Sequence, residues 1–273
     1  MTRHGTRMTR GALRRCVAAS ALLLCTIAPA TVAGGYAPGV NGTGGSTLLV
    51  LGDSLTWGAN YFAKTQSQLA ATQTFDNVIV DGWWSRRIGG IVSTTYSGAN
   101  TYKNTYLKKR VYPTAVIVAL GTNDVYFLSK KREYIAVIRE LMDAIGPVPV
   151  VWLNVHRVDS SRTTVRSRVF NRTLERVLAE YPLASVYDWA NKAKTTSRLM
   201  AFDKIHLTPS GYKVRSNVYA ELAANLAQRV SDATSTTTTT TTTTIDATTT
   251  TIESTTTIQS TTTTVATMTT VAP

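Results

Sequence analysis

Cysteine and histidine are scarce in this chain. Its two cysteines, Cys16 and Cys25, lie within the first 25 residues, and only three histidines occur, His4, His156 and His206. A disulfide framework and a thiolate metal site are therefore excluded for the remainder of the chain. Two histidines beyond the first residues are too few for a zinc cluster. We expect neither a metal nor an organic cofactor.

Acidic residues are absent from residues 1–33, which carry five arginines followed by an apolar run over 16–30. The run ends in small side chains, a layout typical of a secretory signal peptide. It is shorter than the roughly 20 residues that span a bilayer, so we expect no stable membrane insertion after cleavage. We expect the remaining chain to be secreted or associated with the cell wall, and to begin with a linker over 34–46.

Aromatic residues, lysine and arginine are all missing from residues 231–273, in which threonine dominates. Such a segment cannot bury enough apolar surface to offset the entropy lost on ordering. We predict a disordered threonine-rich tail. Its composition fits a mucin-like stalk that is O-glycosylated after export, and it fits an unmodified chain equally well.

A nucleic-acid recognition motif is also absent, although the chain has a formal net charge of +13. An exported protein meets anionic cell-surface polymers, so we expect no nucleic-acid partner. The basic excess fits contact with an anionic cell-wall polymer and fits a plain solvated surface equally well. Residues 47–230 remain as one domain of ordinary size, which we expect to be a monomer.

Short apolar runs alternate with amphipathic segments through this domain. The runs are typical of buried β-strands, and they lie near residues 47–52, 77–82, 115–121, 148–155 and 184–190. Apolar side chains recur at helical spacing between the later runs, as at Ile135, Ile138 and Leu141. Buried strands separated by helices predict a parallel sheet covered on both faces. We expect a three-layer α/β/α sandwich with five strands in the order 2-1-3-4-5.

Glycine and small polar residues follow three of the predicted strands, in "LGDS", "VDGW" and "LGTND". Parallel strands end at one edge of their sheet, where open α/β folds bind ligands, so Ser54, Gly82 and Asn123 should converge there. Ser54 is a candidate nucleophile, although a residue at such a turn also serves as an ordinary helix cap. Acyl transfer needs donors for an oxyanion, and the candidates are the N–H groups of Ser54 and Gly82 and the side-chain amide of Asn123.

A serine nucleophile needs a base, which is usually a histidine, and "FDKIHLTPSGY" supplies one. Asp203 and His206 are three residues apart and share a face if the segment forms a helical turn. Asp203 would then orient the imidazole while His206 takes the proton of the serine. His156 is the rival base. Asp159 is its only acidic neighbour at an orienting spacing, and the adjacent Arg157 disfavours a protonated imidazole.

Four blocks in this order resemble the SGNH superfamily of GDSL-type esterases and acyltransferases. They span almost the whole domain and are "GDSLTWG", the glycine of "VDGWW", "GTND" and "DKIHLTPSGY". The resemblance implies a flavodoxin-like SGNH fold with a catalytic triad of Ser54, His206 and Asp203. It also implies an oxyanion hole formed by Ser54, Gly82 and Asn123.

One position departs from the family pattern, which usually has a second glycine where this chain has Ser85. "VDGWWSRRI" and "VVWLNVHR" are closest in style to the extracytoplasmic SGNH domains of bacterial O-acyltransferases, which modify peptidoglycan or surface glycans. The multi-helix membrane half of those proteins is not in this sequence, which favours a free-standing esterase. Trp57 and Trp83 are candidate substrate-binding residues that would stack on sugar rings or line an acyl pocket, unless they are core or lid residues.

The expected function is that of a secreted serine esterase that removes short acyl groups, acetyl above all, from a carbohydrate or a small ester. One alternative is an O-acetyltransferase that acts on peptidoglycan or surface glycans. Another is a non-catalytic, cell-wall-associated binding protein. The presence of Ser54, Asn123, Asp203 and His206 together weighs against the last, because a decayed enzyme has no chemical need for all four.

Overall fold

Five strands form the centre of the fold. The computed structural model describes residues 45–251, so the predicted signal peptide, most of the linker and residues 252–273 lie outside the described residues. The strands are β1 (Thr47–Gly52), β2 (Asn77–Gly82), β3 (Ala115–Ala119), β4 (Val150–Leu153) and β5 (Ala184–Tyr187). Each lies within or close to one of the apolar runs that predict it.

The strands form one parallel sheet in the order β2-β1-β3-β4-β5, which confirms the predicted order. The register places Gly52, at the end of β1, beside Gly82 of β2 and Ala119 of β3. The loops that follow these three strands therefore start at the same level of the sheet. That common starting point brings together residues that are far apart in the sequence.

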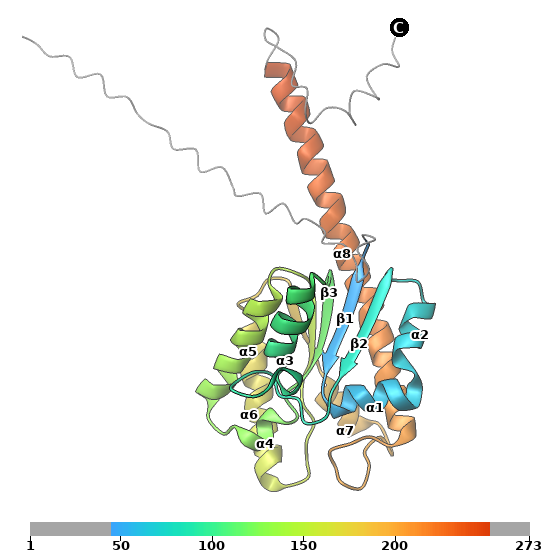
Figure 1. Ribbon diagram of the computed structural model, residues 1–273, viewed down its shortest axis with the longest axis vertical. Helices are drawn as coiled ribbons and strands as arrows, with labels where there is room; N and C mark the ends of the chain where they lie inside the picture. Colours follow the sequence, from blue (N-terminus) through green and yellow to red (C-terminus); the bar gives the residue numbers. More distant parts are fainter. Residues whose placement is uncertain (1–44, 252–273) are drawn as a thin grey trace, which may run out of the picture. The chain divides into compact units, whose positions relative to one another are not determined.

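The connections between the strands are mostly helical. The α-helices are α1 (Ser54–Ala63), α2 (Thr65–Ala71), α3 (Gly98–Thr101), α4 (Asp124–Phe127), α5 (Lys131–Ile145), α6 (Ser161–Leu178), α7 (Trp189–Thr195) and α8 (Pro209–Thr251). Three shorter helical segments cover Thr94–Tyr96, Tyr102–Tyr106 and Leu107–Lys109. The helices lie on both faces of the sheet (Figure 1).

Alternate residues of β1 face the two helical layers. Leu48 and Val50 pack in a core with residues of α1, α2, α7 and α8, whereas Leu49 and Leu51 pack with residues of α3, α5 and α6. All four side chains are fully buried. A strand that is apolar on both faces is the mark of a parallel sheet with two covers, so the predicted three-layer sandwich is confirmed.

The last helix, α8, continues past residue 230, where the composition predicts the start of the tail. Its apolar face ends within the domain, since Leu226 is the last of its fully buried side chains. Residues 231–251 belong to α8 in the structure, and the domain boundary at 230 stays a prediction. Within residues 45–251, no helix is both long enough and apolar enough to cross a membrane.

Candidate active site

Ser54 is the first residue of α1, directly after the turn that leaves β1. The side chain of Asp53 caps this helix by accepting a hydrogen bond from the N–H of Leu55 at 3.0 Å. The carbonyl of Asp53 also accepts hydrogen bonds from the N–H groups of Thr56 and Trp57. The helix is therefore capped by Asp53, and the hydroxyl of Ser54 remains for another contact.

His206 lies beside Ser54, although 152 residues separate them in sequence. The Oγ of Ser54 lies 3.0 Å from the Nε2 of His206, and the Nδ1 of His206 lies 2.7 Å from Oδ2 of Asp203. In such a chain of hydrogen bonds the imidazole takes the serine proton while the carboxylate fixes its tautomer. The structure thus brings together the three residues predicted to form a triad.

Asp203 and His206 share a tight turn and not the helical turn that their spacing allowed. The turn is closed by Oδ1 of Asp203, which accepts hydrogen bonds from the N–H groups of Ile205 at 3.0 Å and of His206 at 2.9 Å. Burial alone would raise the pKa of Asp203, but hydrogen bonds from the His206 ring and from these N–H groups lower it below its usual range. The side chains of His206 and Asp203 are 41% and 33% exposed, so the pair is open to solvent.

The start of α8 holds this turn against α1. The Oγ1 of Thr208 accepts a hydrogen bond from the N–H of Gly211 at 3.0 Å and so caps the helix. One turn further on, the ring of Tyr212 packs on Gly58 of α1, where a Cβ would lie 2.3 Å from the ring. The absence of a side chain at Gly58 lets the two helices approach closely, which places the histidine beside the serine.

Gly82 ends β2 against the first turn of α1. A Cβ at this position would lie 2.1 Å from the backbone nitrogen of Trp57, so only glycine fits. The next residue, Trp83, donates its N–H to the carbonyl of Gly52 at 3.2 Å. Gly82 therefore lies against the first turn of α1, beside the end of β1, where the sequence predicts an oxyanion donor.

Asn123 lies after β3, at the start of α4. Its side-chain Nδ2 donates a hydrogen bond to the carbonyl of Arg86 at 3.0 Å. An amide NH₂ group has two hydrogens, so this bond orients the group and leaves one hydrogen for a ligand. The predicted oxyanion donors, Ser54, Gly82 and Asn123, lie at the ends of three neighbouring strands or shortly after them.

Ser85 stands where the resemblance led us to look for a second glycine. Its φ is +55°, in the left-handed region of backbone conformation. Glycine adopts this region readily, whereas other residues do so at a cost of roughly 1 kcal/mol. The conformation that a glycine would favour is therefore present in this loop with a serine.

Arg86 is a buried residue of the site that sequence reasoning missed. Its guanidinium donates to the carbonyls of Gly52 and Asp81 and pairs with the carboxylate of Asp81 at 2.9 Å, while Nε donates to the carbonyl of Thr95. Its own carbonyl accepts the amide of Asn123. Arg86 thus ties the ends of β1 and β2 to a predicted oxyanion donor. No sequence signal marks it, because two adjacent arginines ordinarily indicate an exposed surface.

A second buried arginine, Arg215 of α8, lies on the buried side of the turn formed by Asp53 and Ser54, which we call the nucleophile turn. Its guanidinium stacks 4.4 Å from the ring centre of Trp189, and its Nε donates to the hydroxyl of Tyr219 at 2.9 Å. That hydroxyl is 2.8 Å from the Oγ1 of Thr56 in α1. Burial raises the pKa of Asp53, and the positive charge of Arg215 is the largest influence opposing that rise. Arg215 therefore stabilises the capped start of α1, through Tyr219 and through its charge beside Asp53.

His156, the rival base, lies outside the hydrogen-bonded triad. Burial lowers its pKa, and the charge of Lys194 adds to the effect. The neutral imidazole was expected, but from the charge of Arg157, whose guanidinium instead pairs with Asp159 at 3.0 Å. The direction of the expected effect is right and its cause is different.

Trp57 and Trp83, the predicted substrate-binding residues, lie on the surface. Trp57 stacks on Tyr61 and meets Trp84 edge-on, with ring centres 5.1 and 5.4 Å apart, and the ring of Trp83 lies 6.5 Å from that of Trp84. All four side chains are exposed. The alternative that the two tryptophans belong to the core is therefore excluded.

The described residues hold no ready-made cation site. Across residues 45–251, no group of three His, Cys, Asp or Glu side chains gathers as metal ligands. The surroundings of Ser54 present an imidazole, a carboxylate and several N–H donors. Such donors suit the negative charge that develops on an ester oxygen under attack.

Comparisons with known proteins agree with this geometry. Residues 50–214, more than half of the chain, match the model of the GDSL-like lipase/acylhydrolase family. No curated protein sequence matches the chain. A lipase/acylhydrolase from Enterococcus faecalis is 17% identical with a TM-score of 0.54, over 67% of this chain and 96% of that protein. A lipolytic protein of the G-D-S-L family from Veillonella parvula is 16% identical with a TM-score of 0.52, over 65% and 96%.

The two structural likenesses, at such low identity, show the shared fold alone. The family match goes further, because it begins inside β1 and ends in the first turns of α8. It therefore includes all four sequence blocks and both turns that meet at the serine. The chain belongs to the GDSL-like lipase/acylhydrolase family, within the SGNH hydrolases, and is a serine ester hydrolase.

Proposed function

We propose that this protein removes short acyl groups, acetyl above all, from a carbohydrate or a small ester outside the cytoplasm. The observation that carries the proposal is the continuous hydrogen-bonded chain from Ser54 through His206 to Asp203. Neighbouring strand ends supply the oxyanion donors. The exposure of the His206 and Asp203 side chains supports an ester whose alcohol part extends into solvent.

Acylation begins with attack of the Ser54 Oγ on the ester carbonyl while Nε2 of His206 takes the hydroxyl proton. The carbonyl oxygen becomes an oxyanion, which receives hydrogen bonds from the N–H groups of Ser54 and Gly82 and from the amide of Asn123. The protonated imidazole then gives its proton to the leaving alcohol oxygen. The acyl group remains on Ser54 as an ester.

Deacylation repeats these steps with water as the attacking group. His206 takes a proton from the water as its oxygen attacks the acyl-enzyme, and it returns that proton to the oxygen of Ser54 as the acid leaves. The imidazolium forms twice in each cycle. Asp203, whose pKa is lowered, remains ionised and stabilises it both times.

The test is hydrolysis of 4-nitrophenyl acetate by the wild-type chain and by the Ser54→Ala and His206→Ala variants. Each substitution should lower kcat by about a thousandfold or more, because removal of either member disables the whole triad. His156→Ala is the matched control and should retain the wild-type rate. Activity retained by Ser54→Ala would contradict the proposed mechanism.

Water as the acceptor and export from the cell are parts of the same proposal. If the folded wild-type protein does not hydrolyse the ester, the proposed function changes to that of an O-acetyltransferase or a non-catalytic binding protein. Adding sugars as acceptors and looking for acetylated products distinguishes these two. The signal-like first 33 residues support export, and the basic excess of the chain supports contact with an anionic cell-wall polymer.

A further inference from the structure

One face of α1 carries the nucleophile and a row of aromatic residues. Trp57 and Tyr61 follow Ser54 at spacings of three and seven residues in this helix. Residues at these spacings lie one above another on the same face of an α-helix. The two rings therefore lie beside a substrate bound at Ser54, on the same helix face and toward the C-terminal end of α1.

The rings of this row are ordered by one another and remain open to solvent. Trp57 and Tyr61 are nearly parallel, with 8° between their planes, and Trp84 meets Trp57 at 75°. Tyr61 and Trp84 are 57% and 58% exposed. Large exposed aromatic groups that gather beside a reactive centre mark an interaction site. Pre-ordered rings also lose little conformational entropy when a ligand binds to them.

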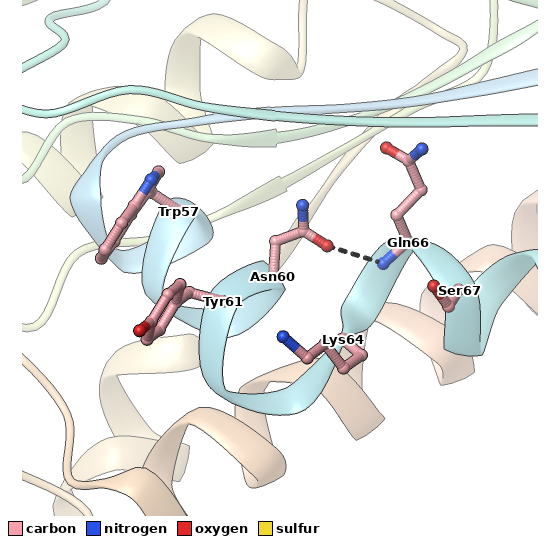
Figure 2. Close-up of a pocket in the computed structure, with 6 residues that line it drawn as sticks. All are labelled: Trp57, Asn60, Tyr61, Lys64, Gln66 and Ser67. Atoms are coloured by element: carbon pink, nitrogen blue, oxygen red, sulfur yellow. Dashed lines mark hydrogen bonds between the residues drawn. The ribbon is translucent and has the colours of Figure 1, made fainter.

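A pocket of about 380 Å³ continues this row at the junction of α1 and α2. Figure 2 shows its lining, in which Trp57 and Tyr61 form an aromatic wall and polar side chains form the rest, namely Asn60, Lys64, Gln66 and Ser67. The wall and the polar groups lie in the same hollow. It is therefore amphipathic and not an apolar groove.

Two of the polar groups are held in place by backbone hydrogen bonds. Oδ1 of Asn60 accepts the N–H of Gln66 at 3.0 Å, and Oε1 of Gln66 accepts the N–H of Val80 at 3.0 Å. Because each amide uses its oxygen in this way, its NH₂ group remains as a donor to a ligand. Lys64 adds a further donor, with Nζ 5.5 Å from the centre of the Tyr61 ring.

We infer that the row and the pocket form a binding subsite for a carbohydrate chain whose acyl ester lies at Ser54. The inference rests on the proposed function and names its substrate class. A sugar ring has apolar C–H faces that suit the aromatic wall and hydroxyl groups that suit the amide, hydroxyl and ammonium donors. A fatty acyl chain would cover the same donors without giving them partners, which costs free energy.

Equilibrium binding to the Ser54→Ala chain tests the subsite without turnover. Titration with xylohexaose and chitohexaose, followed by tryptophan fluorescence, should show saturable binding of at least one of them. Adding Tyr61→Ala should weaken that binding about tenfold or more, whereas Tyr61→Phe, which keeps the ring, should retain most of the affinity. Tyr112 is a matched control, since it is 41% exposed and precedes β3 at the opposite end of the sheet. Tyr112→Ala should leave the affinity unchanged.

Kinetics then show whether the subsite serves the reaction. Tyr61→Ala should lower kcat/KM for acetylated xylohexaose about tenfold more than it lowers kcat/KM for 4-nitrophenyl acetate. The inference is overturned if neither hexaose binds, or if the variant lowers both values by the same factor. It is also overturned if kcat/KM rises with acyl length from acetate to octanoate and Tyr61→Ala abolishes that rise, because the pocket then holds the acyl chain.

The same data separate this inference from the proposed function. Hexaose binding that depends on Tyr61, in a wild-type chain that hydrolyses neither ester, would refute the esterase and leave the carbohydrate subsite standing. Hydrolysis of 4-nitrophenyl acetate without any hexaose binding would leave the esterase and refute the subsite.

Discussion

The inner and outer sides of the nucleophile turn reverse the usual distribution of side chains. On the inner side two arginines, Arg86 and Arg215, are almost completely buried. On the outer side, Trp57, Tyr61 and Trp84 are exposed. Arginine is ordinarily a surface residue and tryptophan is ordinarily covered. The difference separates two tasks, because charged groups hold the backbone of the site in place while aromatic groups are kept for a ligand.

The largest expected effect comes from breaking the inner side at Arg86. Arg86→Met removes donors from the carbonyls of Gly52, Asp81 and Thr95 and leaves the carboxylate of Asp81 without its cation. We expect the free energy of unfolding to fall by about 3 kcal/mol, as for other broken buried ion pairs. Urea unfolding followed by circular dichroism measures the change.

The control for Arg86 is an ion pair on the surface. Arg139 contacts Glu180 at 2.8 Å, and both side chains are nearly half-exposed. Arg139→Met should change the unfolding midpoint only slightly, because exposed pairs gain little over their interaction with water. Equal losses in the two variants would remove the distinction between the inner arginine and an ordinary one.

Arg215 should have the next largest effect. Arg215→Met leaves Asp53 buried without the charge that opposes the rise of its pKa and removes the donor to Tyr219. We expect a loss of about 2 kcal/mol in the free energy of unfolding. In the Asp53→Asn background the same substitution should cost less, because a neutral amide does not need the cation. A double-mutant cycle measures this coupling, and additive losses would contradict it.

Asp124 extends the comparison, because it is a fully buried carboxyl whose ion pair with Arg87 is long. Burial raises its pKa to about 7, and the Nε of Arg87 is 3.9 Å away. The unfolded carboxyl has a pKa of about 4, so between about pH 4 and 7 the folded chain holds a proton that the unfolded chain has lost. The stability contributed by this group is therefore full below pH 4 and falls as the pH rises to about 7.

The measurement for Asp124 is urea unfolding at pH 4.5 and pH 7.5 in the wild-type chain and in Asp124→Asn. The wild type should lose more stability than the variant between the two values, because asparagine does not titrate. Identical losses would show that Asp124 is ionised in the folded protein throughout this range.

The smallest effect on stability is expected on the outer side. Trp84→Ser removes an exposed ring whose described ring contacts are to Trp57 and Trp83. The free energy of unfolding should change by less than about 0.5 kcal/mol, as for most surface substitutions. A loss as large as that of Arg86→Met would mean that the exposed rings of Trp57, Tyr61 and Trp84 stabilise the fold and do not serve ligand binding.

The sequence predicted the strands, their order and the candidate triad because these depend on local patterns. Apolar runs mark strands wherever they occur, and Ser54, Gly82 and Asn123 lie at the end of one of them or shortly after it. The turn at Asp203 was harder to foresee, since it depends on which backbone N–H groups the carboxylate accepts.

The inner side of the site could not be predicted, because it depends on which carbonyls and rings the folded chain brings to the two arginines, some near in the sequence, such as Asp81 and Tyr219, and others far from it, such as Gly52. Arg86 is held by carbonyls of β1, β2 and the short helical segment at Thr95, and Arg215 is held by Trp189 and Tyr219. Nothing near either arginine distinguishes it from an exposed one. Composition therefore counts both as surface charge, although neither contributes to the surface.

In the proposed mechanism Ser54, activated by His206, forms a covalent bond with the acyl group. Intact-mass measurement after treatment with a fluorophosphonate tests this bond, because such a reagent stays on an activated serine. We predict one adduct per wild-type chain, mapped to the peptide that contains Ser54, with no adduct in Ser54→Ala and slow labelling in His206→Ala. An adduct of equal yield in Ser54→Ala, or one mapped to another serine, would show that Ser54 is not the nucleophile.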